Sequence, residues 1–502
     1  MAERTKPKVL IAASEFEPFT SIGHLGRVVS NLSAALSKRI DVRVVIPKYA
    51  SIPKKYSDGA KQVCEFEATL GRRTYPCKVY QTQFRGVTLY LVSAGSYFDR
   101  DQVYSSVVDD IERYSCFCNA VLGMLVRIDF APDVIQCHDW QLSYIPILHR
   151  TNRSRRASDR DFRTLFVIHS MQYQGICTRY DMLDLLDLSS EFFTPATLEF
   201  YGQANSLKGG LLFSDRLLTV SASYAREIQH AYYGENLEGI IRSRSADVTG
   251  ILCGIDTSIF NPKTDDTIHM KYDAATVLAN KPKNKRYLQK LLGFEQNPEI
   301  PLLIIISDIL DYDKGMDLIK FVFDDIMALG VQVILACKGK TDYHEFFTAK
   351  AVQYPGRVSY SRYRGDMAQE AGLAGCDLEN GNGNVTETML ICGSDALLRP
   401  SRIEPCGEKH LLALKYGTLP IVRETGGLKE VVVSLNDDTG EGNGFSFFNY
   451  NAHDMLYTIQ RALTVYKNDR ATWNRLIGAA MRLDFTWDGT AEKYLDVYEA
   501  LM

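Results

Sequence analysis

Short apolar runs alternate with amphipathic stretches from the beginning of the chain. Residues 9–13 and 41–47 are apolar runs of strand length, and residues 23–37 between them carry apolar side chains at helical spacing. A strand, a glycine-containing loop, a helix and another strand predict the start of a parallel α/β sheet. The same alternation recurs at residues 134–137, 164–168 and 216–229.

A second series of the same kind begins near residue 302. Strands are predicted at 302–307, 331–336, 395–398 and 419–422, and helices at 317–328 and 408–416. The polar segment 261–284 separates the two series, so we place a domain boundary just before it, near 255–265. Residues 377–384 (DLENGNGN) have few apolar side chains and predict an exposed loop or insertion.

Together the two series predict an α/β protein with two doubly wound, Rossmann-like domains, residues 1–255 and 256–485. We expect residues 486–502 to form a helix that packs back on the N-terminal domain. Ligands of such sheets bind outside the carboxyl ends of the strands, which predicts a cleft where the two sheets face each other. Periodicity alone does not distinguish glycosyltransferases, phosphorylases, epimerases and binding proteins.

Composition narrows the function classes. Hydrophobic residues make up 46% of the 502, charged residues 24%, and the net charge is −4, which argues against a general nucleic-acid binder. The first apolar run, of about six residues, is too short for a signal-peptide core or a membrane span. The 11 cysteines are scattered without a Cys-x-x-Cys pair, which favours reduced structural cysteines in a cytoplasmic protein and argues against a metal site.

Several longer motifs follow one another along nearly the entire chain. They include KVLIAASEFEPFTSIGHLGRVV from Lys8, DVIQCHDWQLSYIP around His138, IHSMQYQGI containing His169, DKGMDL around Lys314 and RPSRIEPCGEKHLLALKYGTLPIVRETGGLKEVV from Arg399. Read together, these motifs resemble bacterial glycogen synthases and plant starch synthases. Each motif is weak alone, but their shared order is specific for fold and descent.

This resemblance implies a GT-B fold and a retaining glucosyltransferase. Its donor would be ADP-glucose and its acceptor the 4-hydroxyl at the non-reducing end of an α-1,4-glucan, with no cofactor, metal, nucleic acid or membrane partner. Negative charge grows on the leaving diphosphate in the transition state. The site therefore needs cations or amide N–H groups at the phosphates and hydrogen bonds that orient the sugar.

The resemblance assigns the C-terminal candidates to the donor. It places Glu404 over the donor sugar, within a loop that continues through Cys406 and Gly407. It places Lys314 at the diphosphate. Thr425, Gly426 and Gly427 are expected to let backbone N–H groups approach a phosphate.

In the N-terminal half, His169 matches the family histidine that meets the glucose, through its 6-hydroxyl or near the reacting carbon. Asp139 is expected to point into the same cleft and to hold donor or acceptor hydroxyls. The family loop Lys-Thr-Gly-Gly-Leu near the N-terminus reads Ser21-Ile22-Gly23-His24-Leu25 here. We expect Ser21, Gly23 and His24 to lie beside the donor phosphates, with the lysine lost and a histidine replacing a glycine.

The C-terminal half departs from the family pattern as well. Asp308 stands where the family has an arginine, and Glu408-Lys409-His410 replaces Leu-Thr-Gln. An aspartate is unfavourable beside a phosphate by charge. Lys409, Lys338 or Arg402 could supply the missing positive charge.

These departures leave three hypotheses open. The first is an active α-glucan synthase that uses ADP-glucose. The second is a catalytically degenerate GT-B protein that binds glucan or a protein partner, which the lost lysine and arginine favour. The third is a glycosyltransferase with an altered donor or acceptor, which His24 and the Glu408-Lys409-His410 triplet favour.

Overall fold

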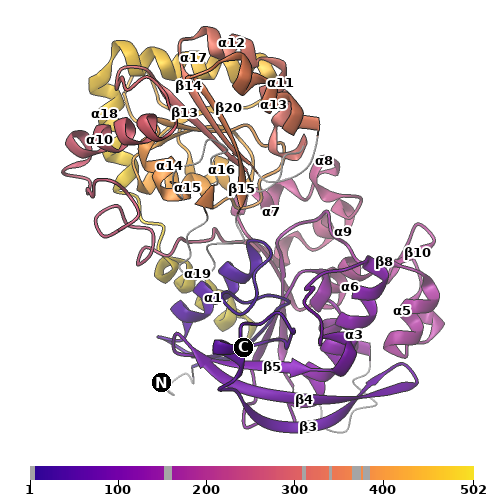
Figure 1. Cartoon of the computed structure of the whole chain (residues 1–502). Helices are drawn as coiled ribbons and strands as arrows, with labels where there is room; N and C mark the ends of the chain where they lie inside the picture. Colours follow the sequence, from indigo (N-terminus) through magenta and orange to yellow (C-terminus); the bar gives the residue numbers. More distant parts are fainter. Residues whose placement is uncertain (1–5, 152–160, 308–311, 338–341, 365–374, 377–384) are drawn as a thin grey trace, which may run out of the picture. The chain divides into compact units, whose positions relative to one another are not determined.

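The computed structural model describes residues 6–151, 161–307, 312–337, 342–364, 375–376 and 385–502. The chain divides into two compact units (Figure 1). Unit 1 comprises Met1–Leu252 together with Trp487–Met502, and unit 2 comprises Cys253–Thr486. Asp308, Lys338 and the segment 377–384 lie outside the described residues.

Unit 1 is built on a sheet with strand order β12-β11-β7-β6-β1-β2-β5-β4-β3. The strands from β12 to β5 are parallel, and β4 and β3 continue the sheet as an antiparallel hairpin that the periodicity analysis did not anticipate. The bounds are β1 Lys8–Ala12, β2 Asp41–Pro47, β3 Lys61–Leu70, β4 Arg73–Phe84, β5 Val87–Ser93, β6 Val134–His138, β7 Arg163–Ile168, β11 Arg216–Thr219 and β12 Val248–Gly250. A small sheet joins β8 Ile176–Cys177, β10 Gln203–Asn205 and β9 Glu199–Phe200.

Helices connect the strands of unit 1. They are α1 Leu25–Leu36, α2 Lys54–Ser57, α3 Val107–Met124, α4 Tyr144–Thr151, α5 Arg179–Leu186, α6 Ser206–Phe213, α7 Ala222–Glu227, α8 Ala231–Gly234, α9 Glu238–Ser243 and α19 Trp487–Leu501. The apolar face of α1 is buried, as its periodicity predicts. Helix α19 packs against α1, where Lys38 pairs with Asp488 at 2.9 Å and Arg39 with Glu492 at 2.9 Å.

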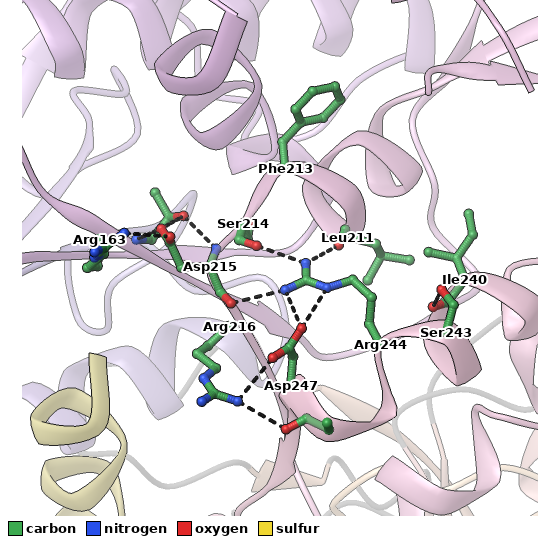
Figure 2. Close-up of polar contacts among 12 residues, drawn as sticks. Arg163, Leu211, Phe213, Ser214, Asp215, Arg216, Ile240, Ser243, Arg244 and Asp247 are labelled. Atoms are coloured by element: carbon green, nitrogen blue, oxygen red, sulfur yellow. Dashed lines mark hydrogen bonds and ion pairs between the residues drawn. The ribbon is translucent and has the colours of Figure 1, made fainter. Parts of the chain in front are cut away.

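A polar network fastens the end of α6 to the strands beside it (Figure 2). The Arg244 guanidinium donates to the carbonyl oxygens of Leu211 at 2.6 Å and Ser214 at 2.8 Å, and to the Asp247 carboxylate at 2.9 Å. Asp215 accepts from the Thr164 N–H at 2.8 Å, which ties β11 to β7. Arg244 thus places a cation at two carbonyl groups at the C-terminal end of α6, which suits the negative end of a helix.

Unit 2 is built on a sheet with strand order β17-β16-β15-β14-β13-β18-β19-β20. The strands β15, β14, β13, β18, β19 and β20 are parallel, whereas β16 and β17 pair antiparallel. The strands are β13 Leu302–Ser307, β14 Gln332–Cys337, β15 Val358–Arg364, β16 Gly375–Cys376, β17 Val385–Thr386, β18 Ala396–Arg399, β19 Leu419–Arg423 and β20 Phe445–Phe447. The helices are α10 Val277–Leu291, α11 Met316–Phe321, α12 Phe323–Ala328, α13 Asp342–Gln353, α14 Glu387–Gly393, α15 Lys409–Lys415, α16 Gly426–Val431, α17 Ala452–Asn468 and α18 Arg470–Met481.

One helix prediction in unit 2 was wrong. Residues 317–328 form two short helices, because the backbone leaves the helical region at Val322, where φ is −112°. Val322 and its aromatic neighbours Phe321 and Phe323 have low helix propensity. Phe323 is buried, whereas Phe321 is exposed. Among the described residues, no helix has both the length and the apolar character that crossing a membrane requires.

Candidate functional site

In unit 1 the polar candidates follow strands that lie side by side. From β1 the chain builds the sheet outward through β2, and it then returns to the other side of β1 with β6, so the strand order reverses between β1 and β6. Ligands of doubly wound sheets bind outside the carboxyl ends of the strands at such a point. Glu15 follows β1, Asp139 follows β6 and His169 follows β7, so all three belong to this edge of the sheet.

Asp139 has a strained backbone and a perturbed carboxyl group. Its φ of 57° is positive, which a side-chain-bearing residue adopts at a cost of about 1–3 kcal/mol. Its carboxylate accepts from the His169 N–H at 2.7 Å. Burial raises the pKa of Asp139 to about 7, although hydrogen bonds from the N–H groups of His169 and Ser170 act against this rise. Strain and a carboxyl that titrates near neutrality are both features of functional sites.

His169 is paired with His138, and both rings are neutral. The Nδ1 atom of His138 lies 2.9 Å from the Nε2 atom of His169. Burial lowers the pKa of His138 to about 3. Burial, and the repulsion that a cationic His169 would meet from cationic forms of His138 and His24, hold the pKa of His169 well below its ordinary value. His138 is fully buried whereas His169 is half-buried, so His169 is the more exposed ring of the pair, and we call it the rim histidine.

The loop that carries Ser21, Gly23 and His24 is held by a residue that the sequence did not single out. The Glu15 carboxylate accepts from the backbone N–H groups of Ile22 at 2.7 Å and Gly23 at 3.2 Å. The Ser21 hydroxyl donates to the Gly23 carbonyl oxygen at 3.2 Å. His24 has a φ of −77°, so a side chain at this former glycine position causes no backbone strain.

The other oxygen of the Glu15 carboxylate also accepts a hydrogen bond. The Tyr104 hydroxyl donates to it at 2.5 Å, and Glu15 is only 2% exposed. The position of Glu15, just after the apolar run 9–13, was the signal that the sequence offered for this role. A glutamate that binds backbone N–H groups, however, leaves no side-chain pattern in the sequence.

In unit 2 the candidates also gather where the strand order reverses. Strand β13 lies between β14 and β18. Lys314 follows β13 in a short 3₁₀ turn, Tyr312–Lys314, and Glu404 follows β18. The ammonium of Lys314 lies 3.2 Å from a Glu404 carboxylate oxygen. The structure therefore places these two predicted residues in direct contact as an ion pair.

Glu404 is the centre of a buried charged cluster. Besides Lys314, it accepts from the Arg399 guanidinium and from the Ser401 hydroxyl at 2.9 Å. Burial alone would raise the pKa of Glu404, but the charges of Arg399 and Lys314 and these hydrogen bonds hold it well below its ordinary range. Glu404 is 6% exposed and therefore stays ionised in a largely dry environment.

The glycines after β19 bring backbone against the Glu404 loop. Gly426 has a φ of 45°, and a Cβ on it would lie 2.0 Å from the Glu404 carbonyl oxygen. A Cβ on Gly427 would lie 1.8 Å from the Cys406 carbonyl oxygen. The Gly427 N–H donates to the Glu404 carbonyl oxygen at 3.1 Å. Close packing of the loop against the start of α16, with Thr425 preceding it, therefore suffices to explain why glycine stands at both positions.

Two of the cations proposed to replace lost charge have carboxylate partners. Arg402 donates to Asp313 at 2.7 Å. The buried Lys409 donates to Glu387 at 2.6 Å, which joins α15 to α14. Gly407, in the same loop, has a φ of 75° and lies against the buried His410 ring. Within the described residues the charge of Lys409 is thus compensated inside unit 2.

Comparisons with known proteins identify the family of the chain. Residues 8–243 match the family model of the starch synthase catalytic domain. The chain is 41% identical over 497 residues to a glycogen synthase of Anoxybacillus flavithermus (strain DSM 21510 / WK1), which covers 99% of this chain and 98% of that protein. A glycogen synthase of Bacillus cereus (strain B4264) is 39% identical over 496 residues, covering 98% of this chain and 99% of that protein.

Solved structures give the fold. The catalytic domain of starch synthase IV from Arabidopsis thaliana, bound to ADP and acarbose, matches with a TM-score of 0.84 at 28% identity and covers 99% of both chains. A sucrose-phosphate synthase from Thermosynechococcus elongatus matches with a TM-score of 0.59 at 14% identity over 99% of both chains, which shows the fold alone. The fold class and family predicted from the sequence are confirmed. The chain is a GT-B glucosyltransferase and belongs to the glycogen synthase and starch synthase family.

Proposed function

We propose that the chain transfers glucose from ADP-glucose to the 4-hydroxyl at the non-reducing end of an α-1,4-glucan, with retention. The observation that carries this proposal is the cluster of Lys314, Arg399 and Glu404 where the strand order of unit 2 reverses. A starch synthase of the same fold is bound to ADP and acarbose, which supports a nucleotide-diphosphate donor and an oligosaccharide acceptor.

In the proposed reaction the bond between the glucose C1 and the diphosphate oxygen breaks, and a bond forms between C1 and the acceptor 4-oxygen. The proton of the acceptor hydroxyl leaves with the ADP. Positive charge develops at C1 and negative charge on the diphosphate. The chain must stabilise both charges as they appear.

Lys314 suits the negative charge. Its side chain is 23% exposed, and an ammonium has three N–H donors, so it can bind Glu404 and a phosphate oxygen together. Glu404 is ionised and rigidly held, which suits hydrogen bonds to sugar hydroxyls and stabilisation of positive charge. We propose that Cys406, Gly407 and the segment Thr425–Gly427 complete the donor pocket through their backbone.

In unit 1 we propose that His169 and Asp139 orient the transferred glucose and that Ser21, Gly23 and His24 form the loop beside the diphosphate. Glu15 fixes the shape of this loop, because its carboxylate accepts from the backbone N–H groups of Ile22 and Gly23. Fixed hydrogen-bonding groups lower the barrier because they do not reorganise during the reaction.

The test is incorporation of radiolabelled glucose into glycogen from ADP-glucose, with UDP-glucose in parallel. Incorporation from ADP-glucose is the expected result. Lys314→Met should lower kcat/KM by roughly 100-fold, by the loss of one charge-stabilising donor. Lys320→Met, at an exposed lysine on α11, should leave it unchanged.

Two other results would refute the proposal in different ways. Incorporation from UDP-glucose alone would indicate an altered donor. No incorporation from either donor by a folded protein that still binds glycogen would support a glucan-binding relative without catalysis, and the serine at position 21 favours that second candidate.

A further inference from the structure

A line of buried hydrogen bonds leads from the C-terminal helix to His169. The Tyr498 hydroxyl, on α19, donates to the Gln136 side-chain oxygen at 2.6 Å. The Gln136 side-chain nitrogen lies 2.7 Å from Nε2 of His138, and Nδ1 of His138 lies 2.9 Å from Nε2 of His169. Gln136, His138 and Tyr498 are all fully buried. All four residues belong to unit 1.

The direction of these bonds depends on which way the Gln136 amide points, and Tyr498 decides this. Among the described residues, the Gln136 side-chain oxygen is the hydrogen-bond acceptor for the Tyr498 hydroxyl. If the amide turned over, that buried O–H would face an NH₂ group and lose its acceptor, at a cost of about 1–3 kcal/mol. The oxygen of the amide therefore faces Tyr498, and its NH₂ group faces His138.

This orientation fixes the protons on both histidine rings. A neutral imidazole has one N–H and one acceptor nitrogen. Because Gln136 donates to Nε2 of His138, the His138 proton is on Nδ1 and is donated to Nε2 of His169. The one proton of the neutral His169 ring must then be on its own Nδ1.

We propose that Tyr498, Gln136 and His138 are positioning residues that set the tautomer of His169 and leave Nδ1–H as its donor. The inference rests on the proposed function for the role of that donor, which is to bind a sugar oxygen as an acceptor. With the opposite tautomer, His169 would present a lone pair at Nδ1, which can accept from a sugar hydroxyl but cannot donate to a sugar oxygen. One amide on β6, held by one hydroxyl on α19, thus determines whether the rim histidine donates or accepts.

Isosteric substitutions test this proposal. Gln136→Glu replaces the NH₂ group by a second acceptor, so His138 must donate through Nε2 and both rings should change tautomer. Tyr498→Phe removes the hydroxyl that selects the amide orientation, so His169 should populate both tautomers. Tyr272→Phe is the matched control, because it removes a buried hydroxyl that donates to the Tyr416 carbonyl oxygen in unit 2.

The readout is the long-range ¹H–¹⁵N spectrum of full-length protein labelled with ¹⁵N-histidine at neutral pH. The chain has 9 histidines, and His169→Gln identifies the signals of this ring. The expected result is a proton on Nδ1 in the wild type, on Nε2 in Gln136→Glu and on both in Tyr498→Phe. A wild-type proton on Nε2, or an unchanged spectrum in Tyr498→Phe, would overturn the proposal. If Gln136→Glu does not fold, Tyr498→Phe decides alone.

Kinetics separate this inference from the proposed function. With ADP-glucose and glycogen, kcat should fall roughly tenfold in Gln136→Glu, the equivalent of one hydrogen bond, with little change in KM. It should fall by less in Tyr498→Phe, in which part of the protein keeps the donating tautomer. Tyr272→Phe should stay within about twofold of the wild type. A changed tautomer with unchanged kcat would support the relay and refute the sugar-binding role of His169. Absence of transfer in every form would refute the proposed function, and the spectra would still decide the relay.

Discussion

Replacing Gly427 with alanine is expected to displace the Glu404 loop and to lower glucose transfer without unfolding the protein. The new Cβ would lie 1.8 Å from the Cys406 carbonyl oxygen. These atoms must separate by roughly 1.6 Å to reach the 3.4 Å of ordinary contact, in a packed interior that yields little. The carbonyl is backbone, so no side-chain rotation relieves the clash.

The displacement should affect activity more than stability. The Gly427 N–H would lose its bond to the Glu404 carbonyl oxygen, and Glu404 would move relative to Lys314. A misplacement of about 1 Å can lower turnover 100-fold. Overpacking of this kind usually lowers the free energy of unfolding by only about 1–3 kcal/mol. The assay is kcat/KM for ADP-glucose with glycogen, together with urea unfolding.

Gly239→Ala is the matched control. Gly239 lies in α9, and a Cβ there would meet nothing within 4 Å. Alanine should therefore leave turnover unchanged and add up to about 1 kcal/mol to the free energy of unfolding. Wild-type turnover in Gly427→Ala would refute the reasoning, because it would mean that the loop can move without consequence for the reaction.

Three further predictions concern buried charge. The pKa of Asp139 is raised from 3.8 to about 7 in the folded state, so between these pH values the folded chain binds a proton that the unfolded chain has lost. The free energy of unfolding therefore falls as the pH rises from about 4 to about 7. Asp139→Asn should remove this pH dependence from unfolding curves measured at several pH values. Lys285→Met should lower the free energy of unfolding by about 3–5 kcal/mol, because it leaves a buried carboxylate without its cation, whereas Lys290→Met on the exposed face of α10 should not. Lys409→Met should cost about 3–5 kcal/mol in the same assay, and adding Glu387→Gln should recover most of that loss. If the two substitutions change the free energy of unfolding additively in the double variant, Lys409 and Glu387 do not interact directly.

The sequence predicted the parallel sheets because their strands and helices have different hydrophobic periods. It placed Asp139 and His169 at strand ends, and Lys314 and Glu404 in loops, for the same reason. It did not predict the role of Glu15, because a bond between a carboxylate and backbone N–H groups depends on how the loop folds back. Tyr498 and Gln136 are 362 positions apart, so no local pattern relates them.

The polar segment 261–284 shows a second limit of prediction from sequence. Its polarity marked it as the boundary between the two series, yet Lys281 within it is buried in unit 2. The Lys281 ammonium donates to the carbonyl oxygens of Cys392 at 2.9 Å and Tyr416 at 3.2 Å and to the Thr418 hydroxyl at 2.7 Å. Polarity in a sequence does not reveal whether tertiary partners will bury it.

The return of α19 to unit 1 has a consequence for synthesis on the ribosome. The sheet of unit 1 emerges first, but Trp487–Leu501 emerges only after the whole of unit 2. Domains usually fold as they emerge, from the N-terminus onward. A nascent chain that has made both sheets therefore still lacks the Tyr498 hydroxyl that binds Gln136. His169 therefore acquires the proposed proton arrangement only after α19 has been made and has packed on unit 1.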